Sequence, residues 1–329
     1  MELTEFEKFR DWIPVRGYRR ENKTFVDWCY LGKARLTEPY FDDSIAKRFR
    51  EPFNLLFRHQ TPIEFLGELN DFSAGLKPTG FIFHLSRCGS TLVSQMLAAL
   101  PQNIVISEAA PVDFVVRSTN ISDEDRIKWL RWMINALGQK RFGPEENFFI
   151  KFDSWNTLEI NLIQRAFPDV PWIFMYRNPV EIIVSQIRQR GWFMIPGLFK
   201  EILPDLSFED SIRMPPEEYC ARVLAKVCQS ALPPVINGEG LAINYSELPD
   251  AVSEKILKHF KLEPAENDRE KMLAATKNDA KHSKMSFSSD IEKKKKDASA
   301  AAIRAAEEFV NPLYEEFERI RKSARKVRL

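Results

Sequence analysis

From Pro78 onward, short apolar runs alternate with stretches of helical periodicity, and this alternation constrains the fold of the chain more than any other feature. The apolar runs are GFIFHL, NIVIS, NFFIKF and PWIFMY, and each is followed by a segment whose apolar residues recur at helical spacing. Strands that alternate with helices are joined by right-handed crossovers, which place parallel strands in one sheet with helices on both faces. The sequence therefore predicts an α/β fold with a mainly parallel central sheet flanked by helices.

Residues 1–77 do not share this alternation. They are rich in aromatic and charged side chains and show mixed periodicity, apart from one strand-like run, TFVDWCYLG. We therefore interpret 1–77 as an N-terminal extension packed on the core, and 78–329 as the main domain. Within that domain, an apolar, loop-like segment at 191–216 is a candidate pocket wall. A helix at 217–231, a short strand LAINY and a helix-forming C-terminal part broken at Pro312 complete the predicted order.

Charge and cysteine content limit the possible partners and compartment. The 329 residues include 48 Lys and Arg against 47 Asp and Glu, so the net charge of +1 favours neither a nucleic acid nor an anionic membrane surface. No run approaches the roughly 20 apolar residues of a membrane span, and no signal-peptide pattern is apparent. The four cysteines form no C-x-x-C pair and are interpreted as reduced thiols. We therefore expect a cytoplasmic protein with no nucleic-acid or membrane partner.

The first predicted anion site follows GFIFHL, where the strand passes through a tight turn at Gly89 into a helix. Backbone N–H groups at a helix N-terminus are unsatisfied and partly positive, and a glycine lets an anion approach them closely. Ser90 and Thr91 add hydroxyl donors, and Arg87 adds a charged fork that matches anionic oxygens. The alternative is purely structural, with Ser90 as a helix cap and Arg87 at the surface. The Walker A pattern G-x-x-x-x-G-K-[ST] does not occur in the chain.

A second predicted anion site lies in PWIFMYRNPVEIIVSQIRQR, where another strand ends at Arg177. Asn178 suits a helix cap, Pro179 suits the first helical position, and Glu181 is placed to close a capping box on Asn178. Ser185 follows two turns into the helix, and its hydroxyl either binds a ligand or bonds the carbonyl four residues back. Two such sites on one sheet, each with an arginine, indicate a ligand with two separated phosphate-type groups.

Taken together, these residues resemble the sulfotransferase family. The loop SRCGSTL is similar to the family's 5'-phosphosulfate loop, and YRNPVEIIVSQI is similar to its 3'-phosphate motif, with Arg177 and Ser185 eight residues apart. RCGSTLVSQMLAALPQNIVISE also resembles the tyrosylprotein sulfotransferase branch, because it keeps Pro101 and places Glu108 twenty-one residues after Arg87. LAINYSEL and SKMSFSSDIEKK resemble later segments of the family. The resemblance covers about 78–296 and leaves the N-terminal extension unassigned.

The resemblance implies a P-loop NTPase-like (sulfotransferase) fold and a sulfuryl donor, 3'-phosphoadenosine 5'-phosphosulfate (PAPS), with 3'-phosphoadenosine 5'-phosphate (PAP) as product. The donor-binding residues that it implies are Arg87, Cys88, Gly89, Ser90, Thr91, Arg177, Ser185, Ser288 and Lys294. Ser288 and Lys294 are matched by alignment with the family's late loop only. Cys88 stands where relatives have a small or hydroxyl residue, so it is either a space-filler or a thiol whose pKa is lowered beside Arg87.

Sulfuryl transfer is in line, and negative charge builds on the departing phosphate oxygen, where Arg87 and the loop amides would stabilise it without a metal. The acceptor hydroxyl needs a base. Glu108 is the first candidate, on the expectation that a partly buried site raises its pKa toward neutrality. Asp153 is the alternative base or a positioning acid, because the chain has Lys-Phe-Asp where cytosolic sulfotransferases keep a histidine. Lys151 either bonds the sulfuryl or leaving-group oxygens, or packs its stem with its amine in water.

We expect the acceptor to be a small alcohol or phenol, with a peptidyl hydroxyl as the other possibility. Trp155, Trp192 and Phe193 are candidate pocket residues, although aromatic side chains near a site often belong to the core. Two other functions remain open. A P-loop nucleotide kinase or NTPase would need a loop lysine and a magnesium-binding acid, and a non-catalytic nucleotide-binding module would keep Arg177 and Ser185 but lose Arg87 or the base.

Overall fold

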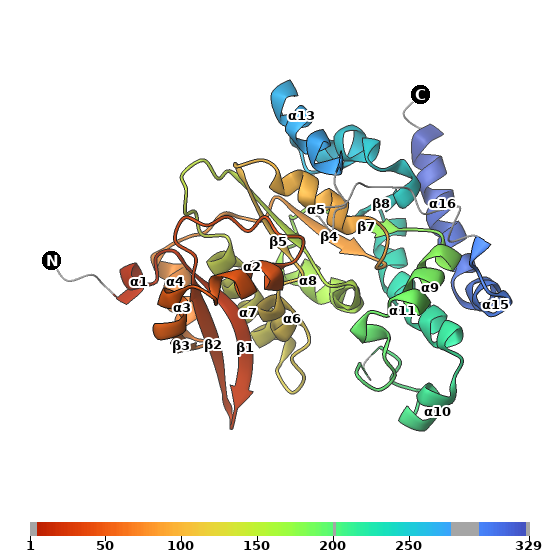
Figure 1. The fold of residues 1–329 in the computed structure, drawn as a ribbon, viewed down its shortest axis with the longest axis horizontal. Coiled ribbons are helices and arrows are strands. Elements are labelled where there is room, and N and C mark those ends of the chain that lie inside the picture. The colour runs from red at the N-terminus through yellow and green to blue at the C-terminus, as the bar shows by residue number, and fades with distance from the viewer. Residues whose placement is uncertain (1–4, 200–201, 278–295, 327–329) are drawn as a thin grey trace.

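The computed structural model describes residues 5–199, 202–277 and 296–326. At its centre lies a five-stranded sheet in the order β5-β6-β4-β7-β8, in which every neighbouring pair is parallel (Figure 1). The strands are β4 (Gly80–His84), β5 (Asn103–Ser107), β6 (Asn147–Lys151), β7 (Trp172–Tyr176) and β8 (Leu241–Asn244). The predicted α/β fold with a parallel central sheet flanked by helices is confirmed. Each of the four apolar runs named above forms one strand.

Alternate residues of the strands point to opposite faces of the sheet, and each face has its own hydrophobic cluster. In β4, Phe81 and Phe83 belong to the larger cluster and Ile82 to the smaller one. Both faces are therefore covered, and this explains why the strands are apolar without alternation. The smaller cluster includes residues of α5 (Ser90–Ala98), η4 (Val252–Ile256), α12 (Leu257–His259) and α13 (Glu266–Ala274).

The larger cluster includes the remaining helices of the main domain. These are α6 (Ala110–Val116), α7 (Asp123–Leu137), η1 (Ser154–Glu159), α8 (Ile160–Ala166), α9 (Pro179–Arg188), α11 (Pro216–Ile236), α15 (Ala300–Phe309) and α16 (Asn311–Lys326). Short turns complete the domain: η2 (Trp192–Met194), α10 (Phe208–Arg213), η3 (Tyr245–Glu247) and η5 (Ala275–Lys277). The segment at 191–216, expected to be loop-like, thus contains one helical turn and one short helix. The expected break near Pro312 falls between α15 and α16, at Val310.

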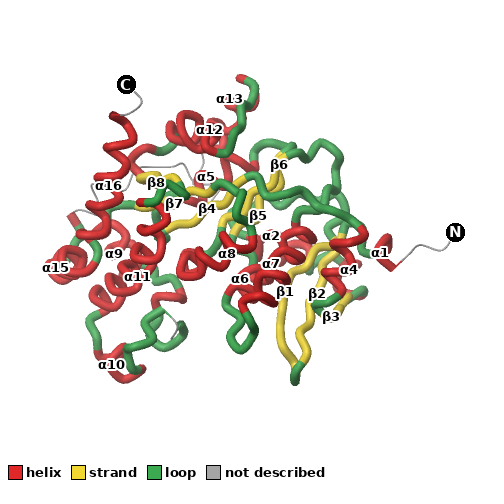
Figure 2. Tube along the Cα trace, turned by 180° about the vertical axis from the view of Figure 1, so that it is seen from behind, coloured by secondary structure: helices red, strands yellow, loops and turns green. Residues whose placement is uncertain are grey.

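The N-terminal extension forms a second, antiparallel sheet in the order β1-β2-β3 (Figure 2). Its elements are α1 (Glu5–Lys8), β1 (Trp12–Arg20), β2 (Lys23–Tyr30), α2 (Phe41–Arg48), α3 (Pro52–Leu56), β3 (His59–Pro62) and α4 (Phe65–Phe72). The larger hydrophobic cluster is continuous across both parts, since it includes Trp28 of β2 as well as Phe81 of β4. Gly17 of β1 lies so close to Phe114 of α6 that a Cβ at Gly17 would sit 2.2 Å from the ring.

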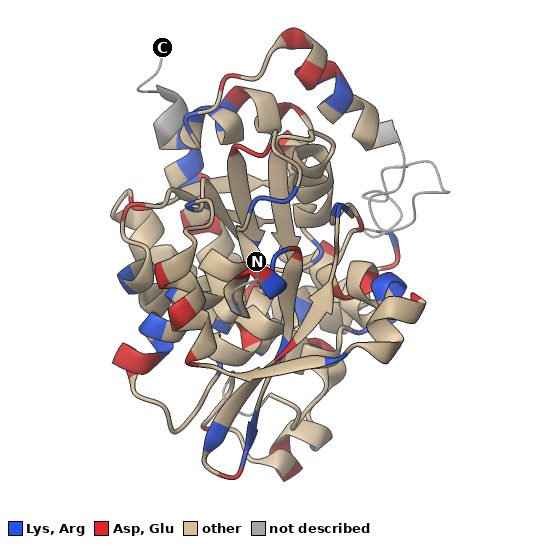
Figure 3. Ribbon diagram, turned by 90° about the vertical axis from the view of Figure 1, so that its left-hand side faces the viewer, with Lys and Arg blue, Asp and Glu red and all other residues tan. Residues whose placement is uncertain are grey.

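Lys and Arg positions and Asp and Glu positions are interspersed along the ribbon in Figure 3, consistent with the near-zero net charge. Among the described residues, no helix has the length and apolar content needed to cross a bilayer. No group of three or more His, Cys, Asp or Glu side chains with the arrangement of a metal site occurs in the ranges that the structure describes.

Candidate active site

Four ionisable residues lie at the carboxyl edge of the parallel sheet, and three of them, Glu108, Lys151 and Arg177, are predicted site residues. His84 and Lys151 are the last residues of β4 and β6, and Glu108 and Arg177 directly follow β5 and β7. Because the strands are parallel and adjacent, their ends converge on one edge, where ligands of open α/β sheets bind. β4 is at the centre of the sheet, so the loop that leaves it is flanked on both sides by the other strand ends.

The loop between β4 and α5 has the predicted strand–turn–helix form. Ser86, Arg87 and Gly89 have positive φ values of 63°, 50° and 84°, and Gly89 caps α5. A Cβ at Gly89 would lie 2.6 Å from Leu248 Cδ1, so the turn needs glycine for space as well as for its φ. Arg87 Nη2 donates to the Gln189 carbonyl at 2.6 Å, which ties the loop to the end of α9. Successive turn amides of this kind form a concave anion site.

A cavity of about 800 Å³ opens in front of this loop. The predicted residues that line the cavity are Arg87, Ser90, Thr91, Glu108 and Asp153. Lys151 is completely buried and does not line the cavity, but its ammonium group contacts two residues that do, Glu108 and Thr91. Cys88, Gly89, Arg177 and Ser185 are not among the lining residues. Ser288 and Lys294 fall outside the described residues.

Glu108 is held between a lysine and a histidine. Its Oε1 lies 2.9 Å from Lys151 Nζ and 3.3 Å from His84 Nε2, and Glu108 itself adopts a positive φ of 55°. Oε2 of Glu108 makes no hydrogen bond or ion pair to any described residue, and the side chain, 21% exposed, lines the cavity. The backbone N–H of Ser86 donates to Nδ1 of His84 at 3.0 Å. A neutral His84 therefore carries its proton on Nε2, the atom that faces Glu108.

These contacts correct one expectation from the sequence. Burial by itself would raise the pKa of Glu108, but the Lys151 ammonium and the contact with His84 outweigh burial and lower the pKa to about 2. We had expected a pKa raised toward neutrality. The reason for the difference is that the nearest partner of Glu108 is a buried cation, which the sequence places 43 residues away (151 minus 108).

Asp153 shows the opposite behaviour. Burial and the neighbouring carboxylates of Glu108 and Asp113 raise its pKa well above the ordinary value. Asp153 also stands at the N-cap of η1, where its backbone N–H donates to Asn156 Oδ1 at 3.2 Å. The site therefore contains one carboxyl group that is readily ionised and one that is readily protonated, as in enzymes that assign different roles to two acids.

The Lys151 ammonium is screened from water by two side chains. Its Nζ lies 3.3 Å from Thr91 Oγ1 and 5.0 Å from the centroid of the Tyr40 ring. Tyr40 directly precedes α2 in the N-terminal extension and also lines the cavity. The possibility that the Lys151 amine reaches water is therefore wrong for this structure, since its side chain is 0% exposed.

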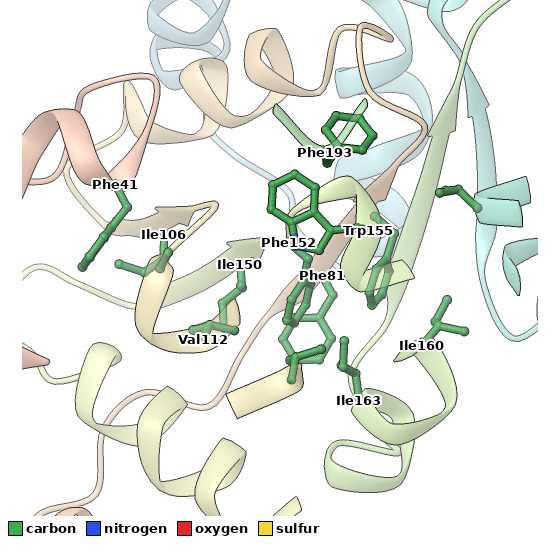
Figure 4. Packing of buried hydrophobic residues seen from close by; sticks show 14 of the residues in the cluster. Phe41, Phe81, Ile106, Val112, Ile150, Phe152, Trp155, Ile160, Ile163 and Phe193 are labelled. Atoms are coloured by element: carbon green, nitrogen blue, oxygen red, sulfur yellow. The ribbon is translucent and has the colours of Figure 1, made fainter. Parts of the chain in front are cut away.

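Aromatic side chains form the wall opposite the loop. Trp155 donates from Nε1 to Asp113 Oδ1 at 2.6 Å, which fixes the indole in the wall. The Trp155 ring lies 5.1 Å from Phe193 and 5.5 Å from Trp192. Figure 4 shows Trp155 and Phe193 together, above Phe152 and Phe81 of the core. Trp155, Trp192 and Phe193 all line the cavity; Trp155 and Phe193 also belong to the core, whereas Trp192 is exposed.

Arg177 is buried, and its guanidinium group already has partners within the protein. Its Nε contacts Glu181 Oε2 at 2.6 Å, and its Cζ lies 3.9 Å from the centroid of the Tyr245 ring. Asn178 caps α9 as predicted, accepting from the Glu181 backbone N–H at 3.4 Å. The Glu181 carboxylate, however, bonds Arg177 and does not close a capping box on Asn178. Arg177 Nη1 also lies 3.5 Å from the Arg87 carbonyl, so the two predicted anion sites are in direct contact.

Ser185 and Cys88 have contrasting environments. Ser185 is half-buried on α9. Cys88 is fully buried, and its thiol donates to the Met175 carbonyl at 3.2 Å. Burial raises the pKa of the Cys88 thiol to about 11, which favours the space-filling interpretation over a reactive thiol.

Sequence reasoning missed several cavity residues, among them His84, Tyr40 and Asp42. His84 had a local signal, because it ends a predicted strand immediately before the loop. Tyr40 and Asp42 had none, since they come from the extension, where no motif connects them with the sheet. Their positions depend on how β1–β3 and α2 pack against the main domain.

No protein-family model matches this chain, and no curated protein matches it. Solved structures do show similarity. A sulfotransferase domain from the curacin biosynthetic pathway has a TM-score of 0.43 and 18% identity, covering 76% of this chain and 98% of that domain. A sulfotransferase from Mycobacterium avium has a TM-score of 0.44 and 10% identity, covering 70% of this chain and 79% of its own. A retinol dehydratase in complex with retinol and PAP has a TM-score of 0.32 and 13% identity, covering 80% and 86%. These are weak similarities.

Proposed function

We propose that this protein is a sulfotransferase that moves the sulfuryl group of PAPS to an acceptor hydroxyl. One observation carries the proposal: Glu108, with its free Oε2, faces the same cavity as the anion loop, and the buried Lys151 lies between Glu108 and Thr91 of that loop. This arrangement provides an anion cradle, a buried cation and a base within one site. The main domain, 78–329, supplies these groups, and the extension, 1–77, covers them with Tyr40.

Each residue has a defined part in the transfer. The loop amides, Ser90 and Thr91 would hold the 5'-phosphosulfate, and Arg87 would stabilise the charge that develops on the phosphate oxygen as its bond to sulfur breaks. The acceptor oxygen forms the new bond to sulfur, and its proton passes to Glu108 Oε2. Lys151 would bond the sulfuryl oxygens during transfer. PAP leaves with the electron pair of the broken bond.

The low pKa of Glu108 is compatible with this role if the donor changes its surroundings. A donor with several negative charges attracts Lys151 and so weakens its contact with Glu108. Both the added negative charge and the loss of this contact raise the pKa of Glu108. His84, whose Nε2 lies 3.3 Å from Oε1, orients the carboxylate. Asp153 remains the alternative base, and its raised pKa supports that alternative.

The 3'-phosphate would bind at Arg177 and Ser185. Arg177 must then exchange Glu181 for the phosphate, or bind both, while the Tyr245 ring keeps the guanidinium in place. Ser288 and Lys294 are carried into this site on the resemblance alone. The aromatic wall of Trp155, Trp192 and Phe193 suits a small alcohol or phenol. We assign the protein to the tyrosylprotein-like branch because Glu108 follows the anion loop, and to the cytoplasm because the four cysteines are free.

The decisive experiment is calorimetric titration with PAP and with ADP, using wild type and Arg177→Ala. We expect PAP to bind more tightly than ADP, and Arg177→Ala to weaken PAP binding by about ten- to hundred-fold. Arg222→Ala is the matched control, because Arg222 also pairs with a glutamate four residues away, Glu218, and lies over an aromatic ring, Phe309, away from the site. Circular dichroism of each variant tests whether it is folded.

The other outcomes separate the alternatives. Equal binding of the two nucleotides, or binding of ADP only with magnesium, contradicts the proposal and favours a nucleotide kinase or NTPase. Selective PAP binding without transfer to any of a panel of alcohols and phenols favours a non-catalytic module. Among active preparations, loss of kcat in Glu108→Gln with retention in Asp153→Asn assigns the base to Glu108, and the reverse result assigns it to Asp153.

A further inference from the structure

A second cavity, of about 740 Å³, adjoins the first one. Asp42 and Ala110 line both cavities, so the two meet at these residues. The second cavity is built almost entirely by the N-terminal extension, with residues from β1, β2, β3 and α2. Helix α2 links the two directly, because Asp42 at its start faces the first cavity and Ile45 and Ala46 face the second.

Two arginines, Arg16 and Arg58, line this second cavity and do not line the first. Arg16 Cζ lies 5.1 Å from the centroid of the Tyr18 ring, and Arg58 Cζ lies 4.9 Å from that of Phe49. Both side chains are exposed, and neither has a hydrogen bond or ion pair to a residue in the described part of the chain. Stacking on a ring orients a guanidinium while leaving its N–H donors available.

Two other arginines that lie over aromatic rings are paired with carboxylates. Arg177 over Tyr245 pairs with Glu181, and Arg222 over Phe309 pairs with Glu218. Arg16 and Arg58 therefore differ from them in having their donors available. Asp27, which also lines the cavity, is half-buried; its carboxylate interacts electrostatically with both arginines and lies at hydrogen-bonding distance from the Tyr18 hydroxyl. His59 and Gln60 of β3 add further polar groups to the same wall.

The wall of the second cavity includes apolar side chains. Val15, Trp28 and Ile45 are buried there, with 6%, 2% and 6% of their surfaces exposed. A ligand that reaches from Glu108 to Arg16 would therefore place its ends among charged groups and its middle on apolar surface.

We propose that the acceptor is an elongated molecule with an apolar body, whose far end carries a carboxylate or similar anion held by Arg16 and Arg58. The inference rests on the proposed function, since it extends the acceptor site of that reaction. Charge sets the orientation: Glu108 and Asp43 line the first cavity but not the second, and together with the anionic donor they would repel the anionic end from the reaction centre. The hydroxyl end therefore lies at Glu108 and the anion lies in the second cavity.

The test uses two homologous series of probes, the ω-hydroxycarboxylic acids from hydroxyhexanoic to hydroxyhexadecanoic acid and the primary alcohols of matched chain length. Binding of each probe is measured by calorimetry with and without PAP, and KM is measured with PAPS. We expect the acids of one favoured length to bind about ten- to hundred-fold more tightly than the matched alcohols. The Arg16→Gln/Arg58→Gln variant should abolish this preference by raising KM for the acids to the level of the matched alcohols.

The matched control is Arg19→Gln/Arg20→Gln, which removes the same charge from exposed positions of β1 outside the cavity. It should keep the preference for acids. Equal binding of acids and alcohols, or a preference that survives Arg16→Gln/Arg58→Gln, overturns the inference while PAP binding upholds the proposed function. The protein could also bind the acids through Arg16 and Arg58 but bind no PAP. That result would uphold the anion site, but it would overturn both its role in an acceptor site and the proposed function.

Discussion

Replacing Lys151 by methionine leaves Glu108 buried beside the anion loop without its counter-charge. The pKa of Glu108 is lowered from 4.5 to about 2, and at 1.36 kcal/mol for each pH unit this difference corresponds to roughly 3 kcal/mol of favourable interaction with the charged form. Breaking one buried ion pair typically costs about 3–5 kcal/mol for the same reason. We therefore expect Lys151→Met to lower the free energy of unfolding by about 3 kcal/mol at pH 7.

The assay is urea unfolding at pH 7 and pH 5, followed by circular dichroism. Lys47→Met is the matched control, because the Lys47 ammonium pairs with Glu38 at the surface and is 55% exposed. Its loss should lower the unfolding free energy by less than about 1 kcal/mol. The double variant Lys151→Met/Glu108→Gln should recover most of the stability, since the carboxylate that lost its partner is then neutral.

The pH dependence gives a second test with a defined sign. In wild type the pKa of Glu108 is lowered, so its stabilising contribution is complete above about pH 4.5 and is lost as the pH falls toward 2. In Lys151→Met, burial acts without the lysine and raises the pKa of Glu108 above 4.5. That variant should therefore gain stability relative to wild type as the pH falls from 7 to 5. A loss no larger than that of Lys47→Met, or one identical at the two pH values, would refute the reasoning.

Three further outcomes follow from the same site. Asp153→Asn should stabilise the protein, and more at pH 8 than at pH 4. The raised pKa of Asp153 means that its ionised form disfavours folding as the pH rises. Equal gains in the free energy of unfolding at both pH values would contradict this. Gly89→Ala should cost more unfolding free energy than Gly238→Ala, since both have similar positive φ values, 84° and 78°, but only Gly89 is crowded; equal costs would show that crowding is unimportant. The four buried cysteines should react with Ellman's reagent only after unfolding in urea, and rapid reaction of a native thiol would contradict the burial that raises the Cys88 pKa to about 11.

Local pattern was sufficient for the elements of the main domain. The apolar runs predicted β4, β5, β6 and β7, and the Asn178–Pro179 pair predicted the start of α9, because caps and strand burial depend on neighbouring residues. In the extension the pattern predicted β2 but missed β1, whose outer half is exposed and charged. The burial of β1 is set by contact with α6, which lies about a hundred residues further along the chain.

The pairing of charges was not predictable in the same way. The sequence indicated that Glu108, Lys151 and Arg177 each follow a strand or end one, and hence that they share an edge of the sheet. It did not indicate that Lys151 would bond Glu108, or that Glu181 would turn from the Asn178 cap to Arg177. These partners depend on side-chain directions at the ends of different strands, to differences of about an ångström. For that reason the direction of the Glu108 pKa shift could not be read from the chain alone.

The electrostatics of the site therefore depend on the part of the chain that the family resemblance does not cover. Lys151 contacts Glu108 and Thr91 from the main domain, but the Tyr40 ring of the extension lies over its ammonium and helps to keep it dry. A charge pair that is shielded from water interacts far more strongly than one that is solvated. If the extension were displaced, water would reach Lys151, and the pKa of Glu108 would move back toward its ordinary value. The extension thus affects the Glu108–Lys151 pair through burial, and its helix α2 also lines the second cavity.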